Sequence, residues 1–92
     1  MFPSPNSEGF FVYTKDNCKY CLMVKELIPD ASYINTESLL VEKKEEFLTF
    51  IEGLVGKPHR TFPIVFYNGA FVGGFIETHR LCAKFEAEND SS

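Results

Sequence analysis

The sequence contains no tryptophan, only two methionines and three cysteines, and no long apolar run. No stretch approaches the ~18 consecutive apolar residues that a membrane-spanning helix needs. Residues 1–8 also lack the basic start and the apolar stretch of a secretory signal. We therefore expect neither membrane association nor secretion. Three cysteines are too few for the disulfide framework that stabilises a small secreted domain.

Basic residues are outnumbered, since nine Lys and Arg stand against 13 Asp and Glu, which gives a net charge of -4. Because binding to phosphates needs a basic face, this balance argues against a nucleic-acid partner. The 92 residues, 45% of them hydrophobic and 24% charged, are typical of one globular domain. An odd number of cysteines with one close pair fits a reducing compartment, so we expect a cytoplasmic protein.

The most informative motif is the pair Cys18-Lys19-Tyr20-Cys21. It follows the apolar run 9–14 and precedes the helix-like stretch 22–28. A strand, a Cys-x-x-Cys pair and then a helix are the layout of a thiol–disulfide active site. The first sulfur would lie at the helix N-terminus, where unpaired backbone N–H groups and the dipole favour the thiolate over the thiol. The motif therefore predicts a nucleophilic Cys18.

The predicted order of elements is βαβαββα, an α/β domain. The elements in order are strand 9–14, helix 19–28, a short strand around 33–34, a helix capped by Ser38 that ends near Gly56, strand 63–67, strand 70–72 and helix 76–86. The first two strands are joined through a helix and should be parallel. Asn68-Gly69 is a strong hairpin signal, so the last two should be antiparallel. This order predicts a four-stranded mixed sheet flanked by helices.

The chain divides into three parts by composition. Residues 1–8 hold two prolines and are expected to form a flexible arm, 9–86 form the domain, and 87–92 form a polar, frayed tail. In the second helix, apolar residues recur with the helical period on one face, at Phe47, Phe50, Ile51 and Leu54. The charged stretch 42–46 is expected to lie on the solvated side of that same helix.

Three motifs in this order, 18–21, Thr61-Phe62-Pro63 and Gly73-Gly74, resemble those of the glutaredoxins of the thioredoxin superfamily. The resemblance covers roughly residues 9–86, and the short form is similar to compact glutaredoxins, including those of phages and large viruses. It implies a thioredoxin fold and a glutathione-dependent thiol–disulfide oxidoreductase. Its substrates would be protein disulfides and protein–glutathione mixed disulfides, with glutathione as reductant and no bound metal.

The resemblance also assigns roles to residues of the motif. Cys18 is the nucleophile, Cys21 resolves mixed disulfides, and Tyr20 borders the glutathione groove. Lys19 stands where the family usually has proline. A cation beside the cysteine favours the thiolate further, unless Lys19 points to solvent and is screened.

The glutathione-binding set implied by the resemblance is Lys15, Tyr20, His59, Arg60, Thr61, Phe62, Pro63, Gly74, Phe75 and Ile76. Lys15 matches a family lysine near the glycine carboxylate, Arg60 precedes the Thr-x-Pro motif as in many members, and His59 stands where a glutamine is common. Pro63 matches a cis-proline. Phe62 would pair through its backbone with the cysteinyl residue of glutathione.

At the other end of the ligand, Gly73-Gly74 would let the backbone approach closely. The backbone N–H groups of Phe75 and Ile76 would bind the γ-glutamyl carboxylate. Ile76 departs from the family, which often has Asp or Ser there. Glu77 or Thr78 is an alternative partner for the ammonium group of the ligand.

Three other functions stay open from the residues alone. A zinc module would use Cys18, Cys21, His79 and Cys82, although Cys82 also fits a small buried apolar residue and His79 an exposed one. Some glutaredoxins share a [2Fe–2S] cluster between two protomers, and a dithiol site does not exclude this. A thioredoxin-type protein would be reduced by a flavoenzyme instead of glutathione. We expect a monomer, and ribonucleotide reductase is a common client of the family.

Overall fold

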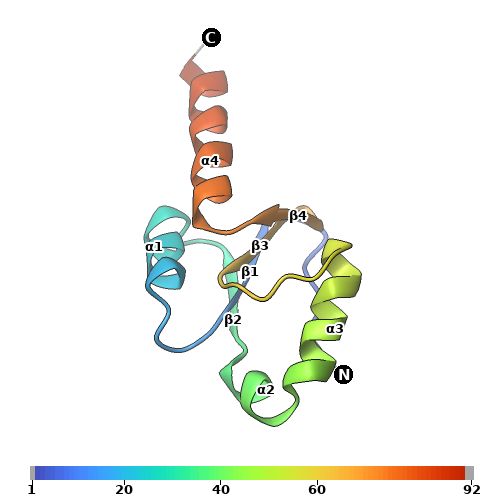
Figure 1. The fold of residues 1–92 in the computed structure, drawn as a ribbon. Helices are drawn as coiled ribbons and strands as arrows, with labels where there is room; N and C mark the ends of the chain where they lie inside the picture. The colour runs from blue at the N-terminus through green and yellow to red at the C-terminus, as the bar shows by residue number, and fades with distance from the viewer. Residues whose placement is uncertain (1, 91–92) are drawn as a thin grey trace.

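The computed structural model describes residues 2–90 and consists of a central sheet with helices on both faces (Figure 1). The elements are β1 (Phe10–Thr14), α1 (Lys19–Leu27), β2 (Ser32–Asn35), α2 (Glu37–Glu42), α3 (Lys44–Val55), β3 (Ile64–Tyr67), β4 (Ala70–Gly73) and α4 (Phe75–Asp90). The sheet order is β2-β1-β3-β4. β1 and β2 are parallel, whereas β1–β3 and β3–β4 are antiparallel. The predicted four-stranded mixed sheet is confirmed.

The antiparallel pairing of β1 with β3 positions the site. Tyr13 near the end of β1 pairs with Ile64 at the start of β3. Because the strands run in opposite directions, the segment that leaves β1 and the segment that enters β3 lie at the same edge of the sheet. The first segment leads to Cys18 and the second carries Phe62 and Pro63. Two motifs more than 40 residues apart therefore meet at one end of the two central strands of the sheet.

Alternation along the strands builds a core on each face of the sheet. Phe11 and Tyr13 of β1 face α3 and pack with a cluster that includes Phe47. Val12 points to the other face and packs with Val24 of α1. Figure 1 shows α1 and α4 on one side of the sheet and α3 on the other. Because β1 is apolar at every position from Phe10 to Tyr13, its side chains contribute to the core on both faces of the sheet.

The predicted second helix is in fact two helices, so that prediction is wrong in detail. α2 ends at Glu42 and α3 begins at Lys44, with Lys43 between them at φ -139° and ψ 43°. Ser38 is exposed inside α2 instead of capping a helix. α2 starts earlier because the buried Thr36 donates from both its N–H and its hydroxyl to the carbonyl of Thr14, which fixes the turn there.

The N-terminal arm has no regular secondary structure, but its residues contact the domain. The ring of Phe2 lies 5.5 Å from those of Phe47 and Phe50 on α3. The hydroxyl of Tyr13 donates to the carbonyl of Pro3. The arm thereby covers one edge of the aromatic core, a contact that the two prolines and the polar residues of segment 1–8 did not predict.

Helix α4 is longer than predicted, because residues 87–90 continue the helix instead of forming a tail. Residues 91–92 of the predicted tail lie outside the described part of the chain. The half-buried residues of α4 include Phe85, whose ring lies 5.4 Å from that of Tyr67. The far end of α4 projects from the body (Figure 1). Within residues 2–90, no helix has both the length and the apolar character needed to cross a bilayer.

Candidate functional site

Cys18 and Cys21 form a disulfide at the N-terminus of α1, with their Cα atoms 5.2 Å apart. Cys18 is the N-cap residue, and its Sγ accepts a hydrogen bond from the backbone N–H of Cys21 at 3.2 Å. Cys18 is half-buried, whereas Cys21 is only 3% exposed. The predicted placement of the first sulfur is confirmed. An incoming group can reach Cys18 far more easily than Cys21.

The first turn of α1 carries no acidic residue. It contains the exposed Lys19 and the exposed Tyr20, whose side chain retains 51% of its accessible surface. A lysine at the first helical position adds its positive charge to that of the positive end of the helix dipole, near the sulfur of Cys18. The local field around that sulfur therefore favours a negative charge.

The loop before β3 lies directly beside the disulfide. The Phe62–Pro63 peptide bond is cis, as the resemblance implied. The Sγ of Cys18 lies 3.7 Å from the carbonyl oxygen of Phe62. The redox-active sulfur and the backbone expected to pair with a ligand are thus neighbours.

A groove of about 530 Å³ starts next to this pair of motifs. Its lining residues come from four separate segments and are Lys15, Tyr20, Arg60, Thr61, Phe62, Pro63, Gly74, Phe75, Ile76 and Glu77. The structure therefore brings together nine of the ten predicted binding residues and adds Glu77. Cys18 lies at the border of the groove, next to Phe62.

Two cationic side chains line the groove near Phe62. The Nζ of Lys15 lies 5.8 Å from the centre of the Phe62 ring. Arg60 forms an ion pair with Glu45, 3.2 Å between Nη2 and Oε1, and both side chains are well exposed. An exposed ion pair contributes little to stability, so Arg60 can exchange Glu45 for a ligand carboxylate at small cost.

His59 is the predicted binding residue that does not line the groove. Its ring packs edge-on against Phe71 at 5.2 Å, and its Nε2 lies 3.4 Å from the hydroxyl oxygen of Thr61. It lines an adjoining hollow that also contacts Glu77. A role of His59 in binding glutathione stays a prediction, although its ring packs against Phe71 and does not line the groove itself.

At the far end of the groove, Gly73 and Gly74 lead into α4. Gly73 has φ +137°, a conformation that other residues rarely adopt, whereas an added Cβ on Gly74 would make only ordinary contacts at 3.7 Å. The N–H of Gly74 donates to Oε1 of Glu77 at 2.8 Å. This donor is therefore already used, while the first N–H groups of α4, at Phe75 and Ile76, have no partner within a regular helix.

Glu77 lines the groove but is absent from the predicted binding set. A Glu three residues after the N-cap, whose carboxylate accepts from the N-cap N–H, is half of a capping box. The spacing Gly74-x-x-Glu77 is therefore the sequence pattern that predicts its position at the start of α4. The hydrogen bond from Gly74 lowers the pKa of Glu77, with Arg80 and His59 adding attraction. Thr78, the other candidate for the ligand's ammonium, is buried and donates to the carbonyl of Gly74 at 2.8 Å. Thr78 is therefore not available to a ligand.

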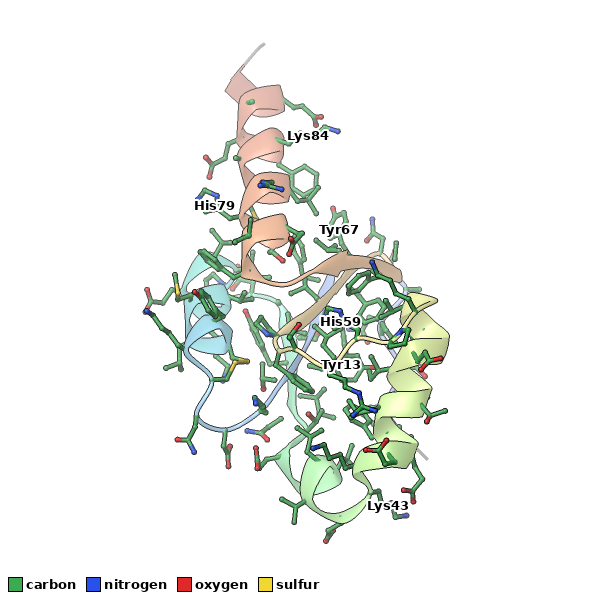
Figure 2. All side chains as sticks on the ribbon, viewed as in Figure 1. Tyr13, Lys43, His59, Tyr67, His79 and Lys84 are labelled. Carbon is green, nitrogen blue, oxygen red and sulfur yellow. A yellow bond between two sulfur atoms is a disulfide. The ribbon has the colours of Figure 1, made fainter. Side chains whose placement is uncertain are left out.

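The residues of the zinc alternative do not converge. Within residues 2–90, no group of three or more His, Cys, Asp or Glu side chains is arranged to hold a metal ion. His79 lies on the projecting helix α4 (Figure 2) and packs against Phe75 at 5.9 Å. Cys82 is partly exposed, and burial together with Glu86 raises the pKa of its thiol. This arrangement leaves the Cys18–Cys21 pair as the chemical centre of the site.

Comparison with known proteins identifies the family of this chain. The Glutaredoxin family model matches residues 10–72. The chain belongs to the glutaredoxin family. This glutaredoxin is 38% identical to human "Glutaredoxin-2, mitochondrial" over 72 residues, which are 76% of this chain and 43% of that protein. It is 31% identical to a glutaredoxin of Neisseria meningitidis over 70 residues, 76% of this chain and 80% of that one.

Solved glutaredoxins share the fold. The structure of glutaredoxin 1 from Francisella tularensis matches with a TM-score of 0.70 at 21% identity, covering 86% of this chain and 96% of that one. A buckwheat glutaredoxin–glutathione complex matches with a TM-score of 0.66 at 27% identity, covering 86% and 72%. This glutaredoxin spans less than half the length of the mammalian relatives it matches.

Proposed function

We propose that this glutaredoxin is a glutathione-dependent oxidoreductase that reduces protein disulfides and protein–glutathione mixed disulfides. The observation that carries the proposal is the position of Cys18. Its sulfur caps α1 and lies 3.7 Å from the carbonyl oxygen of Phe62, at the edge of a groove of about 530 Å³. A reactive sulfur next to a groove with carboxylate-binding groups at both ends suits a tripeptide thiol.

The groove suggests how glutathione binds. Its cysteinyl backbone pairs with the backbone of Phe62 as an added strand, which brings the thiol to Cys18. Lys15 and Arg60 bind the glycine carboxylate through charge-assisted hydrogen bonds. The N–H groups of Phe75 and Ile76 bind the γ-glutamyl carboxylate at the N-terminus of α4. The buckwheat glutaredoxin solved with glutathione supports this ligand class.

The chemistry follows from the unequal access to the two sulfurs. The Cys18 thiolate attacks the glutathione sulfur of a mixed disulfide, forms a bond to it, and releases the protein thiolate, which takes up a proton. A second glutathione then attacks that sulfur, giving glutathione disulfide and free Cys18. For an internal protein disulfide, Cys18 attacks first and Cys21 then displaces the reduced substrate. Two glutathione molecules reduce the resulting Cys18–Cys21 bond.

Turnover with glutathione as the sole reductant is the decisive experiment. We expect a glutathionylated protein to be reduced when glutathione and glutathione reductase are present. A thioredoxin-type protein would instead be inactive under these conditions and active with a flavoenzyme reductase. A Cys18–Cys21 disulfide that glutathione fails to reduce would contradict the proposal.

We also propose three properties that follow from the family. The protein acts as a monomer, it works in a reducing compartment such as the cytoplasm, and ribonucleotide reductase is a candidate client. The Cys18–Cys21 pair supports the second of these proposals, a reducing compartment, because it needs reduction to act. Light scattering, fractionation of cells, and an assay with oxidised ribonucleotide reductase test them in turn.

A further inference from the structure

A second groove of about 490 Å³ adjoins the first. The two grooves share Lys15, Arg60 and Phe62 among their lining residues. The two grooves therefore meet at these three residues, and Phe62 lies beside the sulfur of Cys18. We call the two grooves together the trough; its second half is lined by residues of α2 and α3.

On the side of α2 and α3, the second groove has three apolar residues in a lining that is otherwise mostly polar or charged. These are Leu40, Leu48 and Val41, and Val41 has 73% of its surface exposed. An isolated exposed valine needs no explanation, but an exposed valine that shares a groove with two leucines can pack against an extended chain.

Cations outnumber carboxylates in the lining of the second groove, with Lys15, Lys44 and Arg60 against Asp16 and Glu37. Lys15 and Lys44 both line the groove, and within the described residues the one ion pair is that between Arg60 and Glu45. The two acidic lining residues are engaged with the neighbouring loop. Oε1 of Glu37 accepts from the N–H of Asp16 at 3.1 Å, and Oδ1 of Asp16 accepts from Asn35 at 2.9 Å. The lysines are thus available to an acidic partner.

We infer that the second groove binds the polypeptide that follows the reacting cysteine of a protein disulfide, and that it selects an apolar residue followed by acidic ones. The inference rests on the proposed function, which places the glycine end of glutathione at Lys15 and Arg60. A tripeptide ends there, but a protein chain continues at about 3.3 Å per residue. The next residues then contact Val41 and Lys44.

This docking acts on protein disulfides only. Cys18 forms a bond to the sulfur of the substrate cysteine, the second substrate sulfur leaves as a thiolate, and the chain after the bonded cysteine lies in the trough. Cys21 then displaces it, giving the Cys18–Cys21 disulfide and a substrate dithiol, and two glutathione molecules supply the electrons. With a glutathione mixed disulfide, glutathione itself occupies the first groove and the second groove stays unused.

Two synthetic peptides test the inference with the full chain. Each holds two cysteines closed by an internal disulfide, and the second cysteine is followed by Gly-Leu-Glu-Glu in one and Gly-Leu-Lys-Lys in the other. We expect a preference of about fivefold in kcat/KM for the acidic tail, which high ionic strength should remove because salt screens exposed charges. A small glutathione mixed disulfide is assayed alongside.

Charge reversal at Lys44 supplies the decisive comparison. Lys44→Glu should remove or invert the tail preference, and Val41→Asp should lower the rate on the acidic peptide, each relative to the small substrate. Lys84→Glu on α4 makes the same charge change far from the groove and should keep the preference. Figure 2 shows Lys84 at the opposite end of the molecule from the α2–α3 junction at Lys43.

Both groove positions are exposed, so these variants should fold, which circular dichroism verifies. Equal rates on the two peptides for the natural chain would overturn the inference, as would identical behaviour of Lys44→Glu and Lys84→Glu. If the small substrate is also not reduced, the proposed function fails as well. Reduction of the small substrate without a tail preference overturns the docking inference alone.

Discussion

Oε1 of Glu77 lies 2.8 Å from the backbone nitrogen of Gly74 and accepts its hydrogen bond. This contact closes the first turn of α4 at the end of the groove farthest from Cys18. It places a carboxylate beside N–H groups that we propose bind the γ-glutamyl carboxylate. The same carboxylate can attract the ammonium group of that γ-glutamyl residue, so the helix end offers partners for both charges of the ligand.

The Gly74–Glu77 hydrogen bond predicts a stability effect that depends on pH. The pKa of Glu77 is lowered in the fold from its ordinary 4.5, so the ionised side chain stabilises the fold above that value. The contribution is lost as the pH falls through the lower, folded pKa. Glu77→Gln should therefore be less stable than the natural chain at neutral pH and equal to it in acid, as measured by urea unfolding across pH.

The matched control for Glu77 is Glu26→Gln, which removes an exposed carboxylate on α1 outside the groove. It should leave the pH profile of stability parallel to that of the natural chain. A stability difference for Glu77→Gln that is undiminished at about pH 3 would show that charge is not the cause.

The two cysteines should separate in a mutational test. Cys18→Ser should abolish turnover of all substrates, because no nucleophile remains. Cys21→Ser should still remove glutathione from a glutathionylated protein but lose reduction of internal disulfides. Equal loss in both variants on the glutathionylated substrate would contradict this division, which steady-state assays on the two substrate types measure directly.

Lys19 should increase the reactivity of Cys18. In a chain that carries Cys21→Ser and Cys82→Ala, Lys19→Ala should slow alkylation of Cys18 by iodoacetamide about two- to threefold at low ionic strength. The difference should vanish in high salt, because the charge is exposed. Lys84→Ala is the control. An unchanged rate at low salt would make Lys19 an ordinary surface residue.

Ile76 should limit the affinity for glutathione. Ile76→Ser introduces a hydroxyl where Ile76 now exposes 55% of its surface to the groove region. One added hydrogen bond to a charged group should lower the KM for glutathione about fivefold. Steady-state kinetics at varied glutathione measure this. A raised KM would instead show that the apolar side chain contacts the ligand.

The buried Tyr13 should stabilise the N-terminal arm. Tyr13→Phe leaves the carbonyl of Pro3 without its donor, which should reduce the free energy of unfolding by about 1–2 kcal/mol. Burial raises the pKa of Tyr13 from 10.0 to about 12. The neutral phenol therefore stabilises the fold below pH 10, and this contribution is lost between those values.

Denaturant unfolding at neutral and alkaline pH tests Tyr13, and the exposed Tyr20→Phe is the control. Above pH 10 the natural chain should lose stability faster than Tyr13→Phe. An arm that contributes nothing would leave the two chains equally stable at neutral pH.

Local signals in the sequence predicted most of the fold. A continuous apolar run placed β1, and β-branched and aromatic residues placed β3. Asn68-Gly69 set the hairpin, where both residues have positive φ in the structure, 51° and 81°. Nine of the ten predicted binding residues line one groove because the three motifs fix backbone segments that the sheet then brings together. These features depend on residues close in sequence, or on strand order.

Other features depend on contacts between distant residues, so no local pattern could predict them. The break at Lys43 follows from the early start of α2, which Thr36 fixes by bonding to β1. The position of His59 follows from its contact with Phe71. The contact of Phe2 with Phe47 on α3 joins residues 45 positions apart, so no local pattern marks it.

The pairing of Tyr13 with Ile64 sets the spacing between the two halves of the chemistry. A slip of one residue in that pairing would displace Phe62 by about 3.4 Å relative to Cys18 and move each core side chain of the strand to the other face of the sheet. Misplacement of about 1 Å already slows a reaction strongly. Alignment of two buried strands, which no ligand touches, therefore governs whether the sulfur and its binding partner stand within reach of each other.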